Sequence, residues 1–338
     1  MRRGAALLLL LCLSVLAAPV RAEPLRLATF NTELSRKGPG LLLRDLGRKD
    51  DQIDAVLATI VAAQADILLL QGIDWDYEGQ TLAALVERLT ALGLRYPEQF
   101  TSRPNAGVPS GLDLDGDGRF GEPEDAWGWG RFTGAGGMAL LSRFPIERGA
   151  LRDLTGMLWR DLPDHRMPTL PDGTPYPDPE TAKALRLSSV NHWVVPIRLP
   201  DGSLFSVMAF HAAPPVFDGP EDRNGRRNAD EILLWSHLLA GHLGTPPEPP
   251  FAVLGDANND LTRGEGHKDA LTRLLQDPHL QEPLPKDTEG QSHTALWPQT
   301  GPMRVDYILP STDLKITASG ILRSEGSRHG LIWVDISR

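Results

Sequence analysis

Polar side chains gather at the ends of several apolar segments that read as strands in this 338-residue sequence. They are Asn31, His211, Asp256, Asn258, Asp306 and His329. A single residue of this kind is usually a turn former or a hydrogen-bonded core residue. Six of them at the strand ends of one chain indicate a shared site, because imidazole and carboxylate groups transfer protons and hold metal ions.

The stretch ILLLQGIDWD, residues 67–76, has the same character. An apolar run leads into Gly72, and the acids Asp74 and Asp76 follow. A buried strand that ends in acids marks the rim of a site. Gly72 permits a backbone bend that side chains disfavour, so the bend would direct one of the two acids into that site.

Residues 113–124, DLDGDGRFGEPE, match the twelve-residue calcium loop. The acids at positions one, three, five and twelve are Asp113, Asp115, Asp117 and Glu124. Glycine at position six permits the sharp turn, and Arg119 at position seven would contribute its backbone carbonyl. The sequence shows no flanking helix pair, so we predict a structural Ca²⁺ loop within a glycine-rich insertion near 101–136. The alternative is an acidic loop that binds no ion.

Hydrophobic spacing predicts the elements that position these residues. The expected strands are 25–30, 67–70, 138–141, 191–199, 203–210, 251–254, 305–309 and 331–336. The expected helices are 50–64, 79–93, the later part of 222–243, and 268–276. Residues 151–186, rich in Pro, Asp and Arg, are predicted to form a long loop. Hairpins mixed with helices favour an α/β fold of two packed sheets with outer helices.

With these pieces in place, the sequence resembles the endonuclease/exonuclease/phosphatase superfamily, which includes deoxyribonuclease I. The matching pieces are "ATFNTE", "AFHAAPP", "VLGDANND", "RVDYILPS" and "SRHGLIWVDI", spread over residues 25–338. The resemblance implies a four-layer αββα sandwich forming a single domain over residues 23–338, with loop insertions. It also implies metal-dependent cleavage of phosphate esters, with Mg²⁺ or Mn²⁺ as the catalytic cofactor.

The resemblance also implies a role for each strand-end residue. His329 is similar to the family's general base or electrostatic catalyst, and Asp306 to the carboxylate that orients it. Asp256 resembles the residue that handles the attacking water or a metal ion, and Asn258 the one that holds a phosphate oxygen. His211 resembles the second histidine of the deoxyribonuclease I branch.

Asn31 resembles the family's first-strand Asn beside the metal, but two other positions depart from the family pattern. The second strand normally ends in the main metal-binding Glu, and Gly72 stands there, so Asp74 or Asp76 is the expected substitute ligand. The alternative is that both are loop acids that bind no metal. The usual Ser-Asp-His motif has Arg328 in place of its Asp. Arg328 would either grip a substrate phosphate or weaken metal catalysis.

A further arginine group follows His211, in the segment PPVFDGPEDRNGRRNADE (214–231). Arg223 and Arg227 would suit a loop that grips phosphate. The alternative is a solvated loop that opens a helix beginning near Asn228.

The first 22 residues predict a secretory signal, cleaved after Ala22, because a charged start precedes a short apolar run. The only cysteine, Cys12, lies inside it, so the mature chain has no disulfide. Loss of three arginines leaves 31 basic against 44 acidic residues, a charge of −13. That charge disfavours tight non-specific binding to nucleic acid. No later apolar run is long enough to span a membrane.

We therefore expect a secreted or periplasmic, metal-dependent hydrolase of a phosphodiester or phosphomonoester. Nuclease activity is compatible with the site although the net charge disfavours long DNA. The rival interpretation is a catalytically inactive family member that acts as a calcium-stabilised binding module. Gly72 and Arg328 support the rival, and both histidines oppose it.

Overall fold

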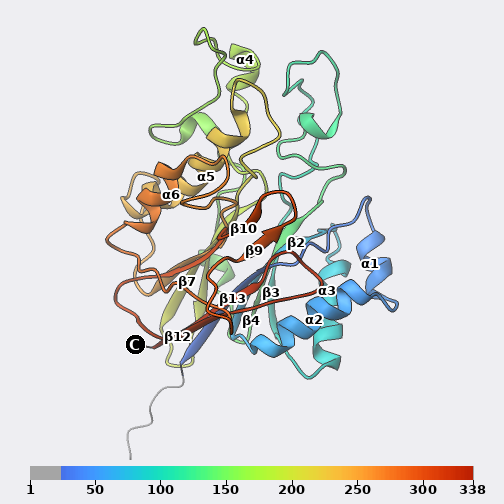
Figure 1. The fold of residues 1–338 in the computed structure, drawn as a ribbon, viewed down its shortest axis with the longest axis vertical. Helices are drawn as coiled ribbons and strands as arrows, with labels where there is room; N and C mark the ends of the chain where they lie inside the picture. Colours follow the sequence, from blue (N-terminus) through green and yellow to red (C-terminus); the bar gives the residue numbers. More distant parts are fainter. Residues whose placement is uncertain (1–23, 338) are drawn as a thin grey trace, which may run out of the picture.

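The computed structural model describes residues 24–337, and it shows two β-sheets packed face to face with helices on both outer faces (Figure 1). This is the predicted four-layer αββα sandwich. The predicted signal segment, residues 1–22, and its Cys12 lie outside the described residues. Within the described part of the chain, no helix has the length and apolar character needed to cross a membrane.

The first sheet has six strands in the order β12-β13-β1-β2-β4-β3. Their bounds are β1 Leu25–Asn31, β2 Ile67–Ile73, β3 Glu98–Phe100, β4 Gly137–Ser142, β12 Lys315–Leu322 and β13 Leu331–Ser337. β1 pairs in parallel with β2 and antiparallel with β13. The first and last strands of the described residues therefore lie side by side near the centre of this sheet.

The second sheet has five strands in the order β11-β8-β7-β6-β5. Their bounds are β5 Arg152–Asp153, β6 His192–Arg198, β7 Leu204–His211, β8 Phe251–Asp256 and β11 Asp306–Pro310. β6 and β7 form the predicted hairpin, and β7 runs parallel to β8. A separate two-stranded ribbon, β9 Ala295–Trp297 with β10 Gly301–Met303, was not predicted.

The side chains of β2 alternate between two hydrophobic cores, and these cores hold the layers together. Leu68 and Leu70 belong to the core beneath the helices, whereas Ile67 and Leu69 belong to the core between the two sheets. Successive strand side chains point to opposite faces, so a strand covered on both faces is apolar throughout. This explains why the sequence reads as a continuous apolar run.

Helices cover each sheet on its outer face (Figure 1). On the first sheet lie α1 Leu41–Leu46, α2 Asp51–Ala63 and α3 Gln80–Ala91, and on the second lie α5 Arg223–Leu239 and α6 Lys268–Leu275. The Asp50 side chain accepts a hydrogen bond from the Ile53 backbone and caps α2. α5 begins at Arg223 and not near Asn228, so Arg223 and Arg227 are helical residues.

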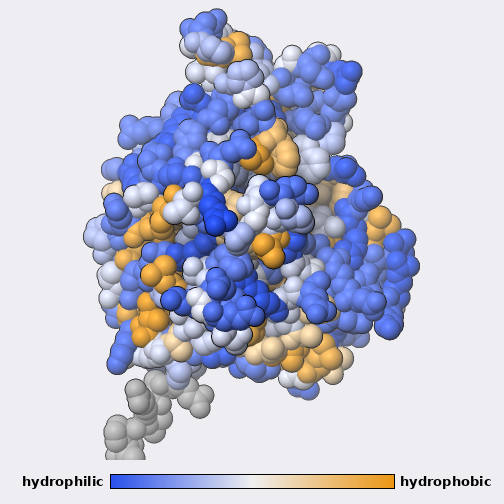
Figure 2. Space-filling model, in the orientation of Figure 1, coloured by the Kyte–Doolittle hydropathy of each residue, from blue (hydrophilic) through white to orange (hydrophobic). Residues whose placement is uncertain are grey.

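The loops that leave one end of the sandwich are long. Residues 101–136 form the predicted glycine-rich insertion, which contains only a short 3₁₀ turn, Pro123–Asp125. Residues 151–186 are also mostly irregular, and their one α-helix is α4, Pro179–Ala182. Both segments lie at the top of Figure 1. Polar residues cover most of the molecular face shown in Figure 2, and apolar residues form separate patches on it.

Leu69→Ala tests the core between the sheets. Leu69 is fully buried, so we expect the substitution to lower the free energy of unfolding by about 2–5 kcal/mol through lost burial and an unfilled cavity. Leu92→Ala, at a position 53% exposed, should change it by no more than about 0.5 kcal/mol. Urea denaturation of both variants measures the difference, and equal losses would contradict this packing.

Candidate active site

Strand register brings three of the predicted residues together. His211 at the end of β7 pairs with Asp256 at the end of β8, and Asp256 pairs with Asp306 at the start of β11. Residues in register on neighbouring strands project from the same face of a sheet. The three side chains therefore stand in one row across the second sheet.

Asn31, at the end of β1, and His329, two residues before β13, reach the same place from the side of the first sheet. The imidazole Nδ1 of His329 lies 2.9 Å from the Asp306 Oδ2 and 4.0 Å from the Asp256 Oδ2. The Asn31 amide donates a 2.9 Å hydrogen bond to the Asp256 Oδ2, and the His211 Nε2 lies 3.5 Å from that oxygen. Five of the six strand-end residues thus converge across the junction of the two sheets.

Asn258, the sixth, is adjacent but its side chain points into a loop. Its backbone N–H donates to the Asp256 Oδ1 at 2.8 Å, and its side-chain amide donates to the Ala212 carbonyl. Its φ of +48° lies in the left-handed region, which Asn tolerates better than most residues. Asn258 therefore holds Asp256 and the segment after β7 in position.

Burial and mutual charge set the protonation of this cluster. Burial and the neighbouring Asp306 carboxylate raise the pKa of Asp256. Burial acts to lower the pKa of His329, but the Asp306 and Asp256 carboxylates outweigh it and raise that pKa. Burial and the nearby His329 lower the pKa of His211 to about 4. His211 is therefore neutral at neutral pH, and Asp256 holds its proton more strongly than an ordinary carboxyl does.

The donor set suits a divalent cation. Ligand atoms of Asp256, Asp306 and His329 all lie within 4.8 Å of one another, and all three residues are buried. The Asp306 Oδ1 and the His211 Nδ1 are buried without a hydrogen-bond partner. Buried polar atoms rarely remain unsatisfied, and hard cations take carboxylate oxygens. A bound cation would also remove the repulsion between the two acids.

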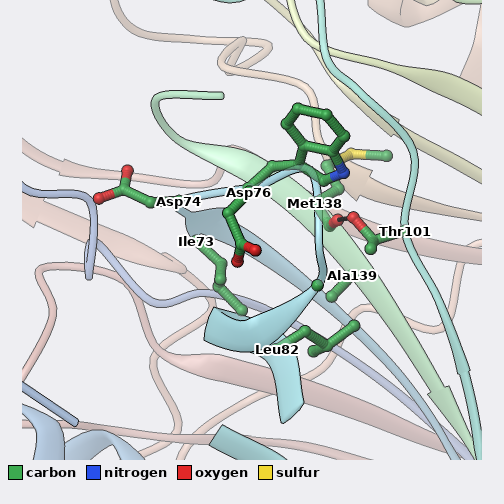
Figure 3. Close-up of a pocket in the computed structure, with 9 residues that line it drawn as sticks. Ile73, Asp74, Asp76, Leu82, Thr101, Met138 and Ala139 are labelled. Atoms are coloured by element: carbon green, nitrogen blue, oxygen red, sulfur yellow. Dashed lines mark hydrogen bonds between the residues drawn. The ribbon is translucent and has the colours of Figure 1, made fainter. Parts of the chain in front are cut away.

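Asp74 and Asp76 do not join this cluster. Asp74 is buried and accepts hydrogen bonds from the Ser35 hydroxyl and from the backbone N–H groups of Arg36 and Gly136. Asp76 accepts from the first backbone N–H groups of α3 and from Glu78. Figure 3 shows their carboxylates directed away from each other. Both oxygens of each acid are occupied in organising the chain after β2.

Gly72 lies inside β2 at an irregularity in the pairing with β4, with φ of +71°. The strand therefore continues beyond Gly72 to Ile73. Arg328 does not face an acid of the cluster, because its guanidinium pairs with Glu33. Glu33 was not predicted as a site residue. Its only sequence signal was its position two residues after Asn31.

The predicted arginines on α5 contact backbone carbonyls. Arg223 donates to the Leu114 carbonyl at 2.7 Å. Arg227 donates to the Arg186 carbonyl at 3.4 Å, and its guanidinium lies 5.2 Å from the centre of the Trp159 ring. Within residues 24–337, neither arginine donates a hydrogen bond to Asp256, Asp306 or His329.

In the predicted calcium loop, Asp113, Asp115 and Asp117 come together with ligand atoms within 4.8 Å of one another. The Arg119 backbone N–H donates to the Asp117 side chain. Glu124, expected at position twelve, instead accepts a 3.0 Å hydrogen bond from the Trp129 indole. The structure therefore assembles three of the four predicted acids.

Glu231, a buried glutamate that was not predicted as a site residue, holds the chain segment that follows His211. Glu231 on α5 accepts from the Ser189 backbone and hydroxyl and from the Ala213 backbone, at 2.6–2.7 Å. Ala213 is two residues beyond His211. Burial raises the pKa of Glu231 to about 7 although these donors oppose the shift. In the sequence Glu231 resembles any helical surface acid, so no pattern marked it.

A search of curated proteins returned no significant match to this chain. The endonuclease/exonuclease/phosphatase family model matches residues 28–329. An endonuclease/exonuclease/phosphatase from Beutenbergia cavernae shares 17% identity over 93% of this chain and 71% of its own, with a TM-score of 0.59. Sphingomyelinase C from Streptomyces griseocarneus shares 16% identity over 92% and 99%, with a TM-score of 0.53. A Bacteroides thetaiotaomicron mannosyl-6-phosphatase shares 14% over 93% and 100%, with a TM-score of 0.53.

The two-sheet sandwich and its buried Asp–Asp–His cluster define a phosphoesterase fold. With the family model spanning most of its length, the chain belongs to the endonuclease/exonuclease/phosphatase family, whose members hydrolyse phosphate esters.

Glu231 should make stability depend on pH. Its folded pKa is raised from 4.5 to about 7, so between these values only the unfolded state loses the proton, and stability falls as pH rises. From pH 5 to pH 8, the free energy of unfolding of the native chain should fall relative to that of Glu231→Gln by up to about 3 kcal/mol. Denaturant titrations at both pH values measure this double difference. A difference that is constant with pH would contradict it.

Proposed function

We propose that this chain is a metal-dependent phosphoesterase that acts on a phosphodiester or phosphomonoester. The observation that carries the proposal is the convergence of His329, Asp306, Asp256, His211 and Asn31 from two sheets on one buried centre. A purely structural site has little reason to bury two carboxylates together, because their repulsion and desolvation oppose folding.

Each residue has a role that its contacts support. Asp306 orients the His329 imidazole through the 2.9 Å hydrogen bond and stabilises its protonated form. His211, neutral and 3.5 Å from Asp256, is able to exchange a proton with a reacting group. Asn31 fixes one Asp256 oxygen, and the Asn258 backbone fixes the other.

Mg²⁺ or Mn²⁺ is the proposed cofactor, and Asp256 and Asp306 would hold it with Asn31 beside them. When bound, the cation supplies charge neutralisation for the phosphate oxygens. Arg328, with a side chain 53% exposed at the rim, is proposed to bind a substrate phosphate. Arg223 and Arg227 would contribute positive potential from α5 rather than direct contact.

The structural relatives include proteins named as a sphingomyelinase and a sugar phosphatase. Both names fit a small or lipid-derived phosphate ester as the substrate. Such a substrate also suits the net charge of −10 better than long nucleic acid does.

Export to the periplasm or the exterior is proposed from the N-terminal signal pattern. The competing function is an inactive binding module, which Gly72 and the Glu33–Arg328 pair favour.

His329→Ala separates the enzyme from the binding module. Loss of the imidazole should reduce hydrolysis of bis-p-nitrophenyl phosphate in Mg²⁺ or Mn²⁺ by about 10²–10⁴-fold. His279→Ala, at an exposed histidine paired only with Asp277, is the matched control and should keep full activity. Circular dichroism confirms that both variants fold. Equal rates for His329→Ala and the native chain would favour the binding module, and plasmid DNA in the same assay tests nuclease activity.

We further propose that the loop at 113–124 binds Ca²⁺ and orders the insertion. Three aspartates converge there, and the Tyr176 hydroxyl donates to the Asp115 carbonyl, which ties the loop to residues 151–186. Ion binding would then stiffen two loops at once. Extracellular calcium sites of this type bind at about 10⁻⁴–10⁻³ M.

Asp113→Ala tests this calcium site. In about 10 mM Ca²⁺ the native chain should gain about 1–3 kcal/mol of stability, which raises its melting temperature by several degrees. Asp113→Ala should lose that gain, because Asp113 provides one of the three converging carboxylates. Asp313→Ala, at an exposed acid elsewhere, should retain it. An unchanged calcium response in Asp113→Ala would end the assignment.

A further inference from the structure

Gly72, Glu33 and Asn31 form one closely packed unit. A Cβ atom built on Gly72 would lie 2.7 Å from the Asn31 Oδ1 and 2.9 Å from the Glu33 backbone nitrogen. Both contacts are too short for a real side chain. Glu33 itself has φ of +50°, which is uncommon for a residue with a side chain. The backbone of Glu33 thus occupies the space that a side chain at position 72 would need.

The Glu33 carboxylate is held differently at its two oxygens. Its Oε2 accepts from the Arg328 backbone N–H at 2.7 Å and from the Ser327 hydroxyl at 3.2 Å. Its Oε1 accepts only from the Arg328 guanidinium, at 2.8 Å from Nε and also from Nη2. The Oε2 atom is therefore held by the main chain and Ser327, whereas the Oε1 atom is held only by one exposed side chain.

Glu33 is also connected to the catalytic cluster. Its backbone N–H donates to the Asn31 Oδ1 at 3.2 Å, and the Asn31 amide donates to Asp256. Ser327 both contacts Glu33 and accepts from the His329 backbone N–H. The Glu33 carboxylate acts electrostatically on His329. Of the three acids Glu33, Asp74 and Asp76, only Glu33 has an oxygen held solely by an exposed side chain.

We propose that Glu33 is a ligand of the divalent cation bound at Asp256 and Asp306, and that the cation and Arg328 compete for its Oε1. This deepens the proposed function and rests on it. Asp74 and Asp76 cannot take this role without giving up the hydrogen bonds that organise the chain after β2. Glu33 gives up only one ion pair, and its Oε2 anchor stays in place.

The exchange is physically favourable for three reasons. A divalent cation attracts a carboxylate more strongly than a guanidinium does. Mg²⁺ and Mn²⁺ prefer oxygen ligands. The Arg328 side chain is 53% exposed, so water readily solvates it after release.

The exchange also links the cation to substrate binding. While Arg328 pairs with Glu33, most of its charge is neutralised by that carboxylate. Once released, its guanidinium is free to bind a phosphate oxygen in a bidentate geometry. Trp297, whose ring centre lies 6.0 Å from that guanidinium and 5.3 Å from the His329 ring, flanks the same space. In this proposal Gly72 leaves room for Glu33, Glu33 binds the cation, and Arg328 is released to bind the substrate phosphate.

Calorimetric titration of Mn²⁺ into the chelator-treated full chain, without substrate, tests the exchange. Glu33→Gln should weaken Mn²⁺ binding at least tenfold, because a ligand is lost. Arg328→Gln should tighten binding at least threefold, because the competitor is lost. Glu325→Gln, at an exposed acid four residues before His329, should leave the affinity unchanged.

The double variant Glu33→Gln/Arg328→Gln distinguishes competition from simple charge repulsion. If Arg328 acts by occupying Glu33, its removal has no effect once Glu33 is neutral. If the same tightening persists in the Glu33→Gln background, or if Arg328→Gln alone fails to tighten binding, the proposal is overturned. Should Glu33→Gln not fold, Glu33→Asp, which shortens the side chain, must weaken binding at least threefold.

Asp256→Asn separates this inference from the proposed function. Loss of Mn²⁺ binding in Asp256→Asn, with no effect of Glu33→Gln, would overturn the role of Glu33 alone. Unchanged binding in Asp256→Asn would instead overturn the cation site on which both proposals depend.

Discussion

The burial of Asp256 beside Asp306 is the constraint on which the rest of the site depends. Two carboxylates on adjacent strands repel each other, and burial removes the water that would screen them. The chain compensates with the His329 imidazole, the Asn31 amide and the Asn258 backbone N–H. These groups come from both sheets, so the sheets must pack in one relative position for the carboxylates to be tolerated. Fold and site therefore stabilise each other, and a bound cation would complete the compensation.

Much of this arrangement is predictable from sequence. Apolar runs such as 67–70 identify strands buried on both faces, and strand-end polar residues such as His211 and Asp256 mark the edge at which the sheets converge. Register is not predictable in this way. The pairing of Asp256 with both His211 and Asp306 depends on tertiary contacts between strands whose paired residues are 45 and 50 positions apart in the sequence. The mixture of hairpins and helices already favoured two packed sheets with outer helices, and the family resemblance implied the same four-layer αββα arrangement.

The proposed replacement of the missing glutamate at position 72 by Glu33 could not be predicted from the sequence, for a physical reason. Sequence proximity pointed to Asp74 and Asp76, but their oxygens are used by local backbone donors. Glu33 is far from Gly72 in sequence and reaches it only because β1 and β2 are parallel neighbours. The left-handed backbone conformation of Glu33 is not predictable from any residue pattern, and it places the Glu33 backbone where a side chain at position 72 would lie. Glu231 escaped notice similarly, since only the packing of α5 shows that it is buried.

The cation site at Asp256 and Asp306 is tested most directly by a crystal structure of the protein soaked with Mn²⁺, with anomalous diffraction recorded at the manganese edge. We expect an anomalous peak between the carboxylates of Asp256 and Asp306, beside Asn31. A well-ordered site in which those two carboxylates share a proton, with no peak at saturating Mn²⁺, would contradict it.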